Sequence, residues 1–296
     1  MGIMRILPSG KYHVHVVARN AQQYFLLKRR KWKAFYLNLL QVYSKIYYFK
    51  VLGFVIMDNH VHLVLEAEDR PFDEQDVRRR FELAQDRLAN SRPFAEEMAE
   101  RYFKRFTSLS EFIKEIHWRM AIAYNKAEGK KGHFWEGRFK SSLIEDGLAL
   151  LNVLTYVAMN PVRAGMVKDP TEFEFSSFAK LKKAVEENRH EEAPKIKIFE
   201  DLPEKIRTAT YLDWVQYAVL ATMEPEVRSK GTPIRFTSLG LELNLEKICS
   251  ELENRAPVAW SNRVYGSIEF RKEMYRKAGW QYKAPRKRKG QPPPEP

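Results

Sequence analysis

Cysteine is almost absent from this chain of 296 residues, since Cys249 is the only one. A single thiol excludes an internal disulfide framework and a thiolate metal cluster. Long apolar runs are missing too: no stretch of about eighteen consecutive apolar residues occurs, which argues against a membrane-spanning helix. The first ten residues also lack the apolar core of a secretory signal peptide. These absences predict a cytoplasmic protein without a membrane partner.

Acidic residues are scarce relative to basic ones. The chain has 51 Lys and Arg against 38 Asp and Glu, giving a net charge of +13. Such an excess favours a polyanionic partner, either nucleic acid or an anionic membrane surface. We expect nucleic acid and a nucleoid-associated location, because no amphipathic helix joins a wide apolar face to a uniformly basic one. A hydrophobic fraction of 44% is ample for a sizeable core, in one or two domains.

The pattern of apolar residues predicts an α+β fold. Alternating and helical periodicities follow one another as a strand (11–20), a helix (28–48), two strands (48–56 and 60–66), a helix (108–128), a strand-containing segment (133–145) and a helix (147–159). A tight turn at Asp58-Asn59 joins the middle strands, and Ser108 or Ser110 caps the second helix. This order fits a ferredoxin-like, split βαβ sheet with one appended helix.

Composition divides the chain into further regions. Residues 1–181 form the predicted first domain, interrupted by a charged helical insertion at 67–107. A linker (182–199), a mostly helical C-terminal region (200–280) and a disordered basic and proline-rich tail (281–296) follow. Residues 236–256 faintly suggest a helix-turn-helix, although a plain helical packing module fits equally well.

Two histidines lie one residue apart in the strand at 60–66. Side chains alternate along a strand, so His60 and His62 share a face and form a pair of metal ligands that needs a third partner. A second such pair, His13 and His15, warns that the pattern arises easily by chance. We expect His13 and His15 to pack or to bond locally, on a strand that neighbours the first pair.

The helix at 147–159 carries the complementary groups. Tyr156 and Asn160 are four residues apart and therefore share one helical face. An amide oxygen suits a hard cation such as Mg²⁺ or Mn²⁺, and a tyrosine oxygen can attack a phosphodiester polarised by that cation. Two plainer interpretations stay open: a core aromatic for Tyr156, and a helix C-cap before Pro161 for Asn160.

Basic residues interleave with aromatic residues just before this helix. Cations on phosphates and rings on bases suit single-stranded DNA, although a solvated loop with core aromatics is equally compatible. The residues concerned are Lys130, Lys131, Arg138 and Lys140 around Phe134, Trp135 and Phe139. Arg163 follows Tyr156 closely enough to contact a phosphate, and the basic run at 285–289 predicts non-specific, salt-dependent affinity.

Three strings together resemble a known family. MDNHVHLVLE, GHFWEGRFKSSLIEDGLALLNVLTYVAMNPVRAGMV and EFEFSSF, in this order, are similar to the IS200-type transposases. They look in particular like the REP-associated tyrosine transposases, which belong to the HUH single-strand endonucleases. The resemblance spans roughly residues 8–181, apart from the insertion. The G-R-F-K-S and Y-x-x-x-N-P-V-R-A-G strings are far more specific than the histidine pair.

The resemblance implies a function and a site. His60, His62 and Asn160 would bind Mg²⁺ or Mn²⁺, and Tyr156 would form a 5′-phosphotyrosine link to single-stranded or hairpin DNA. Arg19 joins the basic residues named above as a DNA contact, in a protein that acts as a monomer or homodimer.

Two residues depart from the family pattern. Asp58 stands where proline is frequent, and its carboxylate is close enough to tune or disturb the metal. Asn20 stands where glycine is usual and tolerates the left-handed conformation that glycine would take. A domesticated regulator that binds DNA or RNA on the same fold without cutting is the alternative, against which the intact set of four site residues argues.

Overall fold

The computed structural model describes residues 10–68, 70–86, 93–189, 194–197, 203–223 and 264–279. A five-stranded sheet has the order β2-β3-β1-β4-β5, with antiparallel neighbours except for the parallel pair β4 and β5. The strands are β1 (Tyr12–Arg19), β2 (Phe49–Ile56), β3 (His60–Ala67), β4 (Lys140–Ile144) and β5 (Val264–Tyr265). The first four strands have the order of the predicted ferredoxin-like sheet, which is thereby confirmed.

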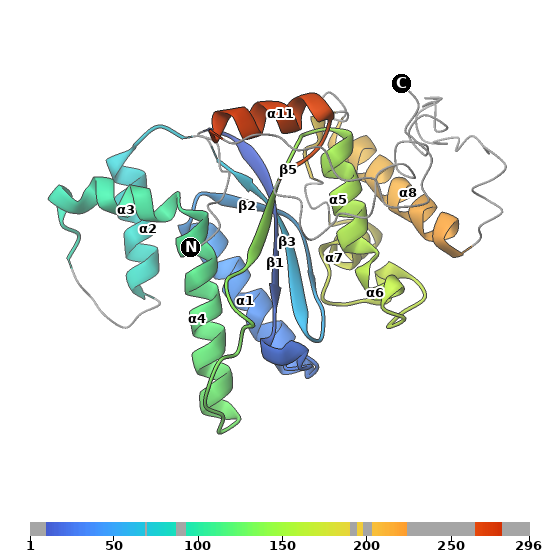
Figure 1. Cartoon of the computed structure of the whole chain (residues 1–296), viewed down its shortest axis with the longest axis horizontal. Coiled ribbons are helices and arrows are strands. Elements are labelled where there is room, and N and C mark those ends of the chain that lie inside the picture. Colours follow the sequence, from blue (N-terminus) through green and yellow to red (C-terminus); the bar gives the residue numbers. More distant parts are fainter. Residues whose placement is uncertain are drawn as a thin grey trace.

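Helices cover both faces of the sheet (Figure 1). On one face lie α1 (Arg30–Ile46) and α4 (Leu109–Ala127); on the other lie α5 (Leu148–Ala158), α6 (Asn160–Arg163), α7 (Ser177–Glu186) and α8 (Glu204–Met223). Short 3-10 helices occupy Ala21–Gln23, Glu96–Met98 and Pro170–Glu172. The Ser108 side chain caps α4 by accepting a hydrogen bond from the backbone of Glu111 at 3.3 Å, as the sequence predicted.

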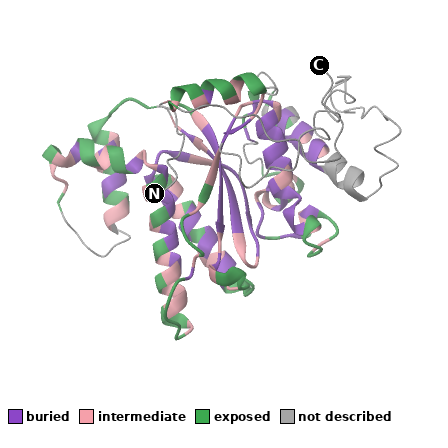
Figure 2. Ribbon diagram, viewed as in Figure 1, coloured by how far each residue is buried: buried purple, intermediate pink, exposed green. Residues whose placement is uncertain are grey.

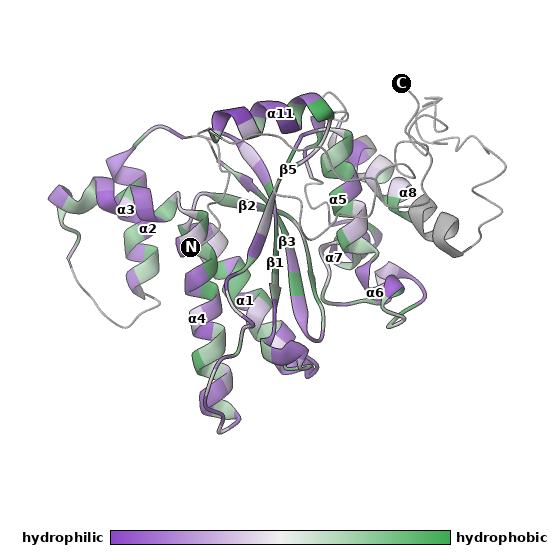
Figure 3. Cartoon of the chain, in the orientation of Figure 1, coloured by the Kyte–Doolittle hydropathy of each residue, from purple (hydrophilic) through white to green (hydrophobic). Residues whose placement is uncertain are grey.

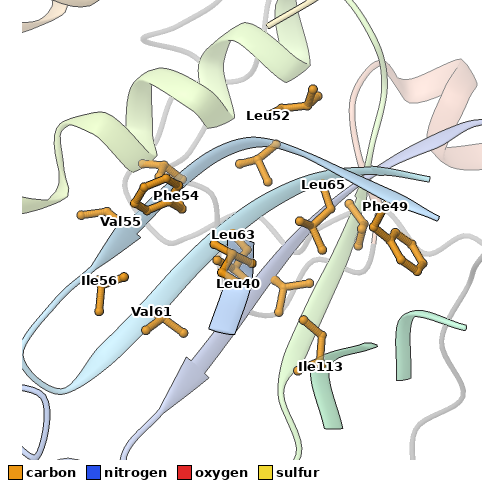
Figure 4. Packing of buried hydrophobic residues seen from close by; sticks show 14 of the residues in the cluster. Leu40, Phe49, Leu52, Phe54, Val55, Ile56, Val61, Leu63, Leu65 and Ile113 are labelled. Atoms are coloured by element: carbon orange, nitrogen blue, oxygen red, sulfur yellow. The ribbon is translucent and has the colours of Figure 1, made fainter. Parts of the chain in front are cut away.

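One part of the core lies between the sheet, α1 and α4. Val61, Leu63 and Leu65 alternate along β3 towards Leu40 of α1 and Ile113 of α4 (Figure 4). The strands and the inner helix surfaces are largely buried (Figure 2), with apolar and polar residues both present along the strands (Figure 3). The intervening residues of β3 face α5, so this second face of the sheet is where polar strand residues gather.

A glycine brings α5 close to the sheet. A Cβ atom at Gly53 of β2 would lie 2.6 Å from the Leu154 side chain of α5, too close for any larger residue. The β2–β3 register shifts between Val51 and Gly53, which bends the strand at the same place. Gly53 thus leaves room for the Leu154 side chain, so that α5 packs closely against β2.

The helical insertion is anchored at the C-terminal end of α1. It contains α2 (Glu74–Asp86) and α3 (Ala99–Phe106). Arg80 of α2 is buried, pairs with Asp76 at 2.8 Å, and donates to the backbone carbonyls of Lys45, Ile46 and Tyr47 at 3.2 to 3.3 Å. These carbonyls carry the negative end of the helix dipole, so a guanidinium there satisfies and stabilises them.

The C-terminal segment attaches to the edge of the sheet through β5 and α11 (Ile268–Lys277). Glu145 accepts hydrogen bonds from the backbone N–H of Ser267 at 2.6 Å and from its hydroxyl at 3.0 Å. Gly266 has a φ of 153° and lies so close that a Cβ would meet Glu145 at 2.6 Å.

The structure describes only parts of the regions predicted after residue 181. Helix α7 continues to Glu186, five residues into the segment predicted as a linker. The predicted helix-turn-helix and the basic tail lie outside the described residues.

Candidate active site

His60 and His62 project from β3 towards α5. They lie on the same face, with ring centroids 5.0 Å apart and ring planes at 76°. His62 is fully buried, whereas His60, at the start of the strand, is partly exposed. One imidazole is thus fixed in the interior and the other lies at the rim of the site.

Burial keeps His60 neutral. Burial first, and then the nearby charge of Arg19, lowers the pKa of the His60 imidazole to about 4, against a smaller raising effect of the hydrogen bond with Asn160. The Nδ1 atom of His60 lies 2.7 Å from the side-chain oxygen of Asn59. The ring is therefore uncharged at neutral pH, which is the form that binds metal ions.

His62 contacts a third histidine. Its Nδ1 atom lies 2.9 Å from Nε2 of His15 on β1, in a buried contact. Burial above all lowers the pKa of His62 well below its usual value, and burial lowers the pKa of His15 to about 4. His13 instead contacts Glu66 at 3.0 Å. The second histidine pair thus packs locally, as expected, but one of its members contacts the candidate site.

Tyr156 and Asn160 face these histidines from the helical layer. The Tyr156 ring centroid is 5.7 Å from that of His62, and the Asn160 side chain hydrogen-bonds both His60 and Tyr156. Helix α5 ends at Ala158, close to the predicted end at 159, and its C-cap residue is Met159 and not Asn160. A short helix, α6, begins at Asn160 and has Pro161 in its first turn. Proline is tolerated at that position because a backbone N–H in the first turn has no partner within the helix. The plain C-cap interpretation of Asn160 is therefore wrong.

The phenol of Tyr156 is partly buried. Burial raises its pKa, while Arg163, the hydrogen bond from Asn160 and the charge of Arg19 lower it. The Arg163 guanidinium lies over the Tyr156 ring at 4.9 Å from its centroid. Two cations thus lie where negative charge on the phenol oxygen, or on a phosphate beside it, would be stabilised.

The donor set fits a hard divalent cation. In the described part of the chain, no three His, Cys, Asp or Glu side chains come together as a metal site. A third ligand beside His60 and His62 therefore has to be of another type, and the Asn160 amide oxygen is the neighbouring candidate. Two neutral imidazoles and one amide oxygen suit Mg²⁺ or Mn²⁺ with positions open for substrate and water.

The predicted DNA contacts divide into two groups. Arg19 pairs with His60 in the β1–β3 register, and Lys140 lies on the same sheet face in the row of Val17 and His62. Together with Arg163 they border the site. The other three predicted contacts are exposed on the segment between α4 and β4: Lys130, Lys131 and Arg138. Of these, Arg138 lies between Glu136, whose N–H donates to the Arg19 carbonyl at 2.8 Å, and Lys140.

The aromatics between these basic residues belong largely to the core. Phe134 is 2% exposed, and Trp135 stacks on His117 at 4.0 Å between ring centroids. Trp135 also donates through Nε1 to the His117 carbonyl at 3.0 Å. For Phe134 the core interpretation holds and the stacking of bases on its ring is wrong, because interleaving with lysines does not determine which way a ring points. Trp135 is only partly buried.

Both departures from the family pattern have structural explanations. Asn20 is extended (φ −67°, ψ 151°), not left-handed, because its backbone pairs with Asn59 on one side and with Trp135 on the other. Asp58 is paired away from the candidate metal site. It forms an ion pair of 2.5 Å with the buried ammonium group of Lys33 on α1.

An exposed aromatic pair beside the site was not predicted. Tyr24 and Phe25 are 59% and 64% exposed, in the loop that follows Arg19. Gln22 and Gln23 before them adopt left-handed φ values of 53° and 58°, which is strained for residues other than glycine. The Asn59 side chain donates to the Gln23 carbonyl at 3.4 Å, which ties the loop to the turn before His60. Two adjacent aromatics in the loop that follows the first strand were the available signal.

Comparisons with known proteins give a family match over part of the chain. No helix in the described parts of the chain is long and apolar enough to cross a membrane. No curated protein matches the chain. A solved structure of a REP-associated tyrosine transposase bound to a REP hairpin is similar, with 17% identity, a TM-score of 0.41, and coverage of 62% of this chain and 86% of that one. Residues 9–71, which hold β1, α1, β2 and β3 with both site histidines, match the family model of IS200-like transposases, and the family resemblance is thereby confirmed over this segment.

Proposed function

We propose that this protein is a metal-dependent, single-strand DNA endonuclease and transposase that cuts and rejoins DNA beside hairpins. The observation that carries the proposal is the convergence of four residues from two distant segments. His60 and His62 of β3 meet Tyr156 and Asn160 of α5 and α6, through ring contacts and the Asn160 hydrogen bonds. The family match over residues 9–71 and the net charge of +13 support a DNA substrate.

The chemistry follows from the groups present. A divalent cation held by His60, His62 and Asn160 would polarise the scissile phosphate. The Tyr156 oxygen attacks phosphorus, so that a phosphotyrosine bond forms and the bond from phosphorus to the 3′ oxygen breaks. The phenol gives up its proton and the departing 3′ oxygen takes one up. The phosphotyrosine keeps the energy of the broken bond, and attack by a 3′ hydroxyl rejoins the strand without ATP.

The surface around the site supplies two kinds of DNA contact. Arg19, Lys140 and Arg163 border the site and suit the phosphates of the reacting strand. Tyr24 and Phe25 present exposed rings beside the turn before His60, and such rings stack on unpaired bases. An unpaired strand satisfies both kinds of contact, whereas a duplex hides its base faces.

The test is covalent capture. A labelled hairpin with a single-stranded flank is incubated with the protein and Mn²⁺, and adducts are resolved under denaturing conditions. We expect an adduct with the wild type and with Tyr102→Phe, a matched change in the insertion, but none with Tyr156→Phe.

Two results would contradict this proposal. An adduct that persists in Tyr156→Phe rules out Tyr156 as the nucleophile. A wild type that binds hairpins and Mn²⁺ yet forms no adduct on any of them favours the non-cleaving regulator, which binds DNA or RNA on the same fold.

A further inference from the structure

We propose that His15 and Asn59 are positioning residues, each of which accepts the Nδ1 hydrogen of one site histidine and so commits Nε2 of that ring to the metal. The inference rests on the proposed function, and it assigns a role to two residues that lie outside the ligand set. A neutral imidazole carries one hydrogen, and the partner of one ring nitrogen decides which nitrogen holds it. Only the other nitrogen then has a lone pair for a metal ion.

Asn59 determines this choice for His60. The Nδ1 atom of His60 lies 2.7 Å from the Asn59 side-chain oxygen, which accepts but cannot donate. His60 also has a hydrogen-bond partner in the Asn160 side chain. We assign the ring hydrogen to Nδ1, which leaves the lone pair of Nε2, together with the Asn160 oxygen, to a metal ion. The Asn59 amide nitrogen donates in turn to the Gln23 carbonyl at 3.4 Å, which fixes the orientation of the amide.

His15 makes the equivalent contact with His62. The two rings are parallel to within 9°, with centroids 5.1 Å apart, and Nε2 of His15 lies 2.9 Å from Nδ1 of His62. Rings stacked face to face are separated by about 3.5 Å, so a nitrogen–nitrogen distance of 2.9 Å places the two rings edge to edge. In this arrangement Nε2 of His15 and Nδ1 of His62 point at each other and form a well-aligned hydrogen bond.

The direction of this hydrogen bond follows from the role of His62. Both rings are buried, at 4% and 0% exposure, and buried imidazoles are uncharged. One nitrogen donates and the other accepts. If His62 donates from Nδ1, its Nε2 is open to a metal; if His15 donates, His62 must carry its hydrogen on Nε2 and cannot bind one. We assign the first arrangement.

The neighbouring histidine offers a matched control. His13 lies two residues before His15 on the same face of β1, is equally buried, and contacts Glu66 rather than the site. A change at His13 thus disturbs the same strand to a similar degree without touching His62. His15→Gln and Asn59→Asp keep a side-chain oxygen that can accept the hydrogen, whereas His15→Leu and Asn59→Ala do not.

Two measurements test the assignment. The first is the tautomer of His62 in metal-free protein, read from the ¹⁵N shifts of its ring. We expect the Nδ1–H form in the wild type and its loss in His15→Leu. The second is Mn²⁺ affinity by calorimetry, which we expect to fall about 10- to 100-fold in His15→Leu and Asn59→Ala. His15→Gln, Asn59→Asp and His13→Leu should stay near the wild type.

Three outcomes would overturn the inference. These are an Nε2–H tautomer of His62 in the wild type, an unchanged Mn²⁺ affinity in folded His15→Leu, and an equal loss in His13→Leu. A wild type that binds no Mn²⁺ would instead contradict the proposed function. The tautomer measurement would still decide whether His15 orients His62.

Discussion

The side chain of Asn160 donates a hydrogen bond from Nδ2 to the backbone carbonyl of Tyr156, one helical turn earlier, at 2.9 Å. An amide is planar, so this bond also sets the direction of its oxygen. The helix break between α5 and α6 leaves the Tyr156 carbonyl available to accept it. The proposed nucleophile and the proposed third ligand are thereby held together as one unit.

Removing this amide should abolish metal-dependent adduct formation. We expect Mn²⁺ affinity in Asn160→Ala to fall by more than about 100-fold, since losing a ligand costs more than losing an outer partner. Calorimetry and the adduct assay measure the two effects. Asn152→Ala is the matched control, because Asn152 is a buried asparagine on α5, one helical turn before Tyr156. Equal losses in both variants would show a packing effect rather than ligation.

Replacing the exposed aromatic pair should weaken binding to single strands. The double variant Tyr24→Ala, Phe25→Ala loses two stacking surfaces, each worth about 1–3 kcal/mol per base. We expect the Kd for a single-stranded oligonucleotide, measured by fluorescence anisotropy, to rise at least about 10-fold, with little change for a duplex. Trp118→Ala, an exposed aromatic on α4, should leave both affinities unchanged. A uniform loss on both DNA forms would argue against stacking.

The insertion should contribute to stability independently of catalysis. Arg80→Met leaves Asp76 and the C-terminal carbonyls of α1 without their buried guanidinium, a change that costs about 3–5 kcal/mol. Arg79→Met removes an exposed partner of the same carboxylate and should cost less than about 1 kcal/mol. Urea unfolding measures both. Similar midpoints for the two variants would contradict the anchoring role of Arg80.

Mild acid should destabilise the fold through His117. Burial lowers the pKa of this ring to about 3, whereas the unfolded chain titrates near 6.5. The unfolded state therefore binds the extra proton first, and stability falls as the pH drops below about 6.5 towards 3. At pH 5 the loss relative to pH 7 is about 2 kcal/mol.

Unfolding curves in His117→Gln should show a shallower pH dependence than the wild type. The slope that remains belongs to the other buried histidines and, at the acid end, to carboxylates such as Asp76, whose pKa is lowered by hydrogen bonds from Arg79 and Arg80. His133→Gln, at an exposed position, should keep the full slope. An unchanged slope in His117→Gln would refute the assignment.

The sequence predicted the four main strands and the helix of the site because their signals are local. Periodicity marks β3 and α5, and the rules of split βαβ connections place β1 beside β3. The role of His15 depends on how β1 and β3 are aligned, which no local pattern reveals. The conformation of Asn20 is likewise set by two backbone partners that are distant in sequence. Strand β5 was missed because Glu145 and Ser267 meet across 122 residues.

The last strand also has a protective effect. Unpaired N–H and C=O groups along the edge of a sheet invite pairing with another molecule. β5 covers Leu143 and Ile144 of β4, and α11 follows it directly. A chain shortened before Val264 would keep every residue of the proposed site yet expose that stretch of backbone. Self-association of such a shortened chain would then reflect an uncovered strand and not the assembly of the native protein.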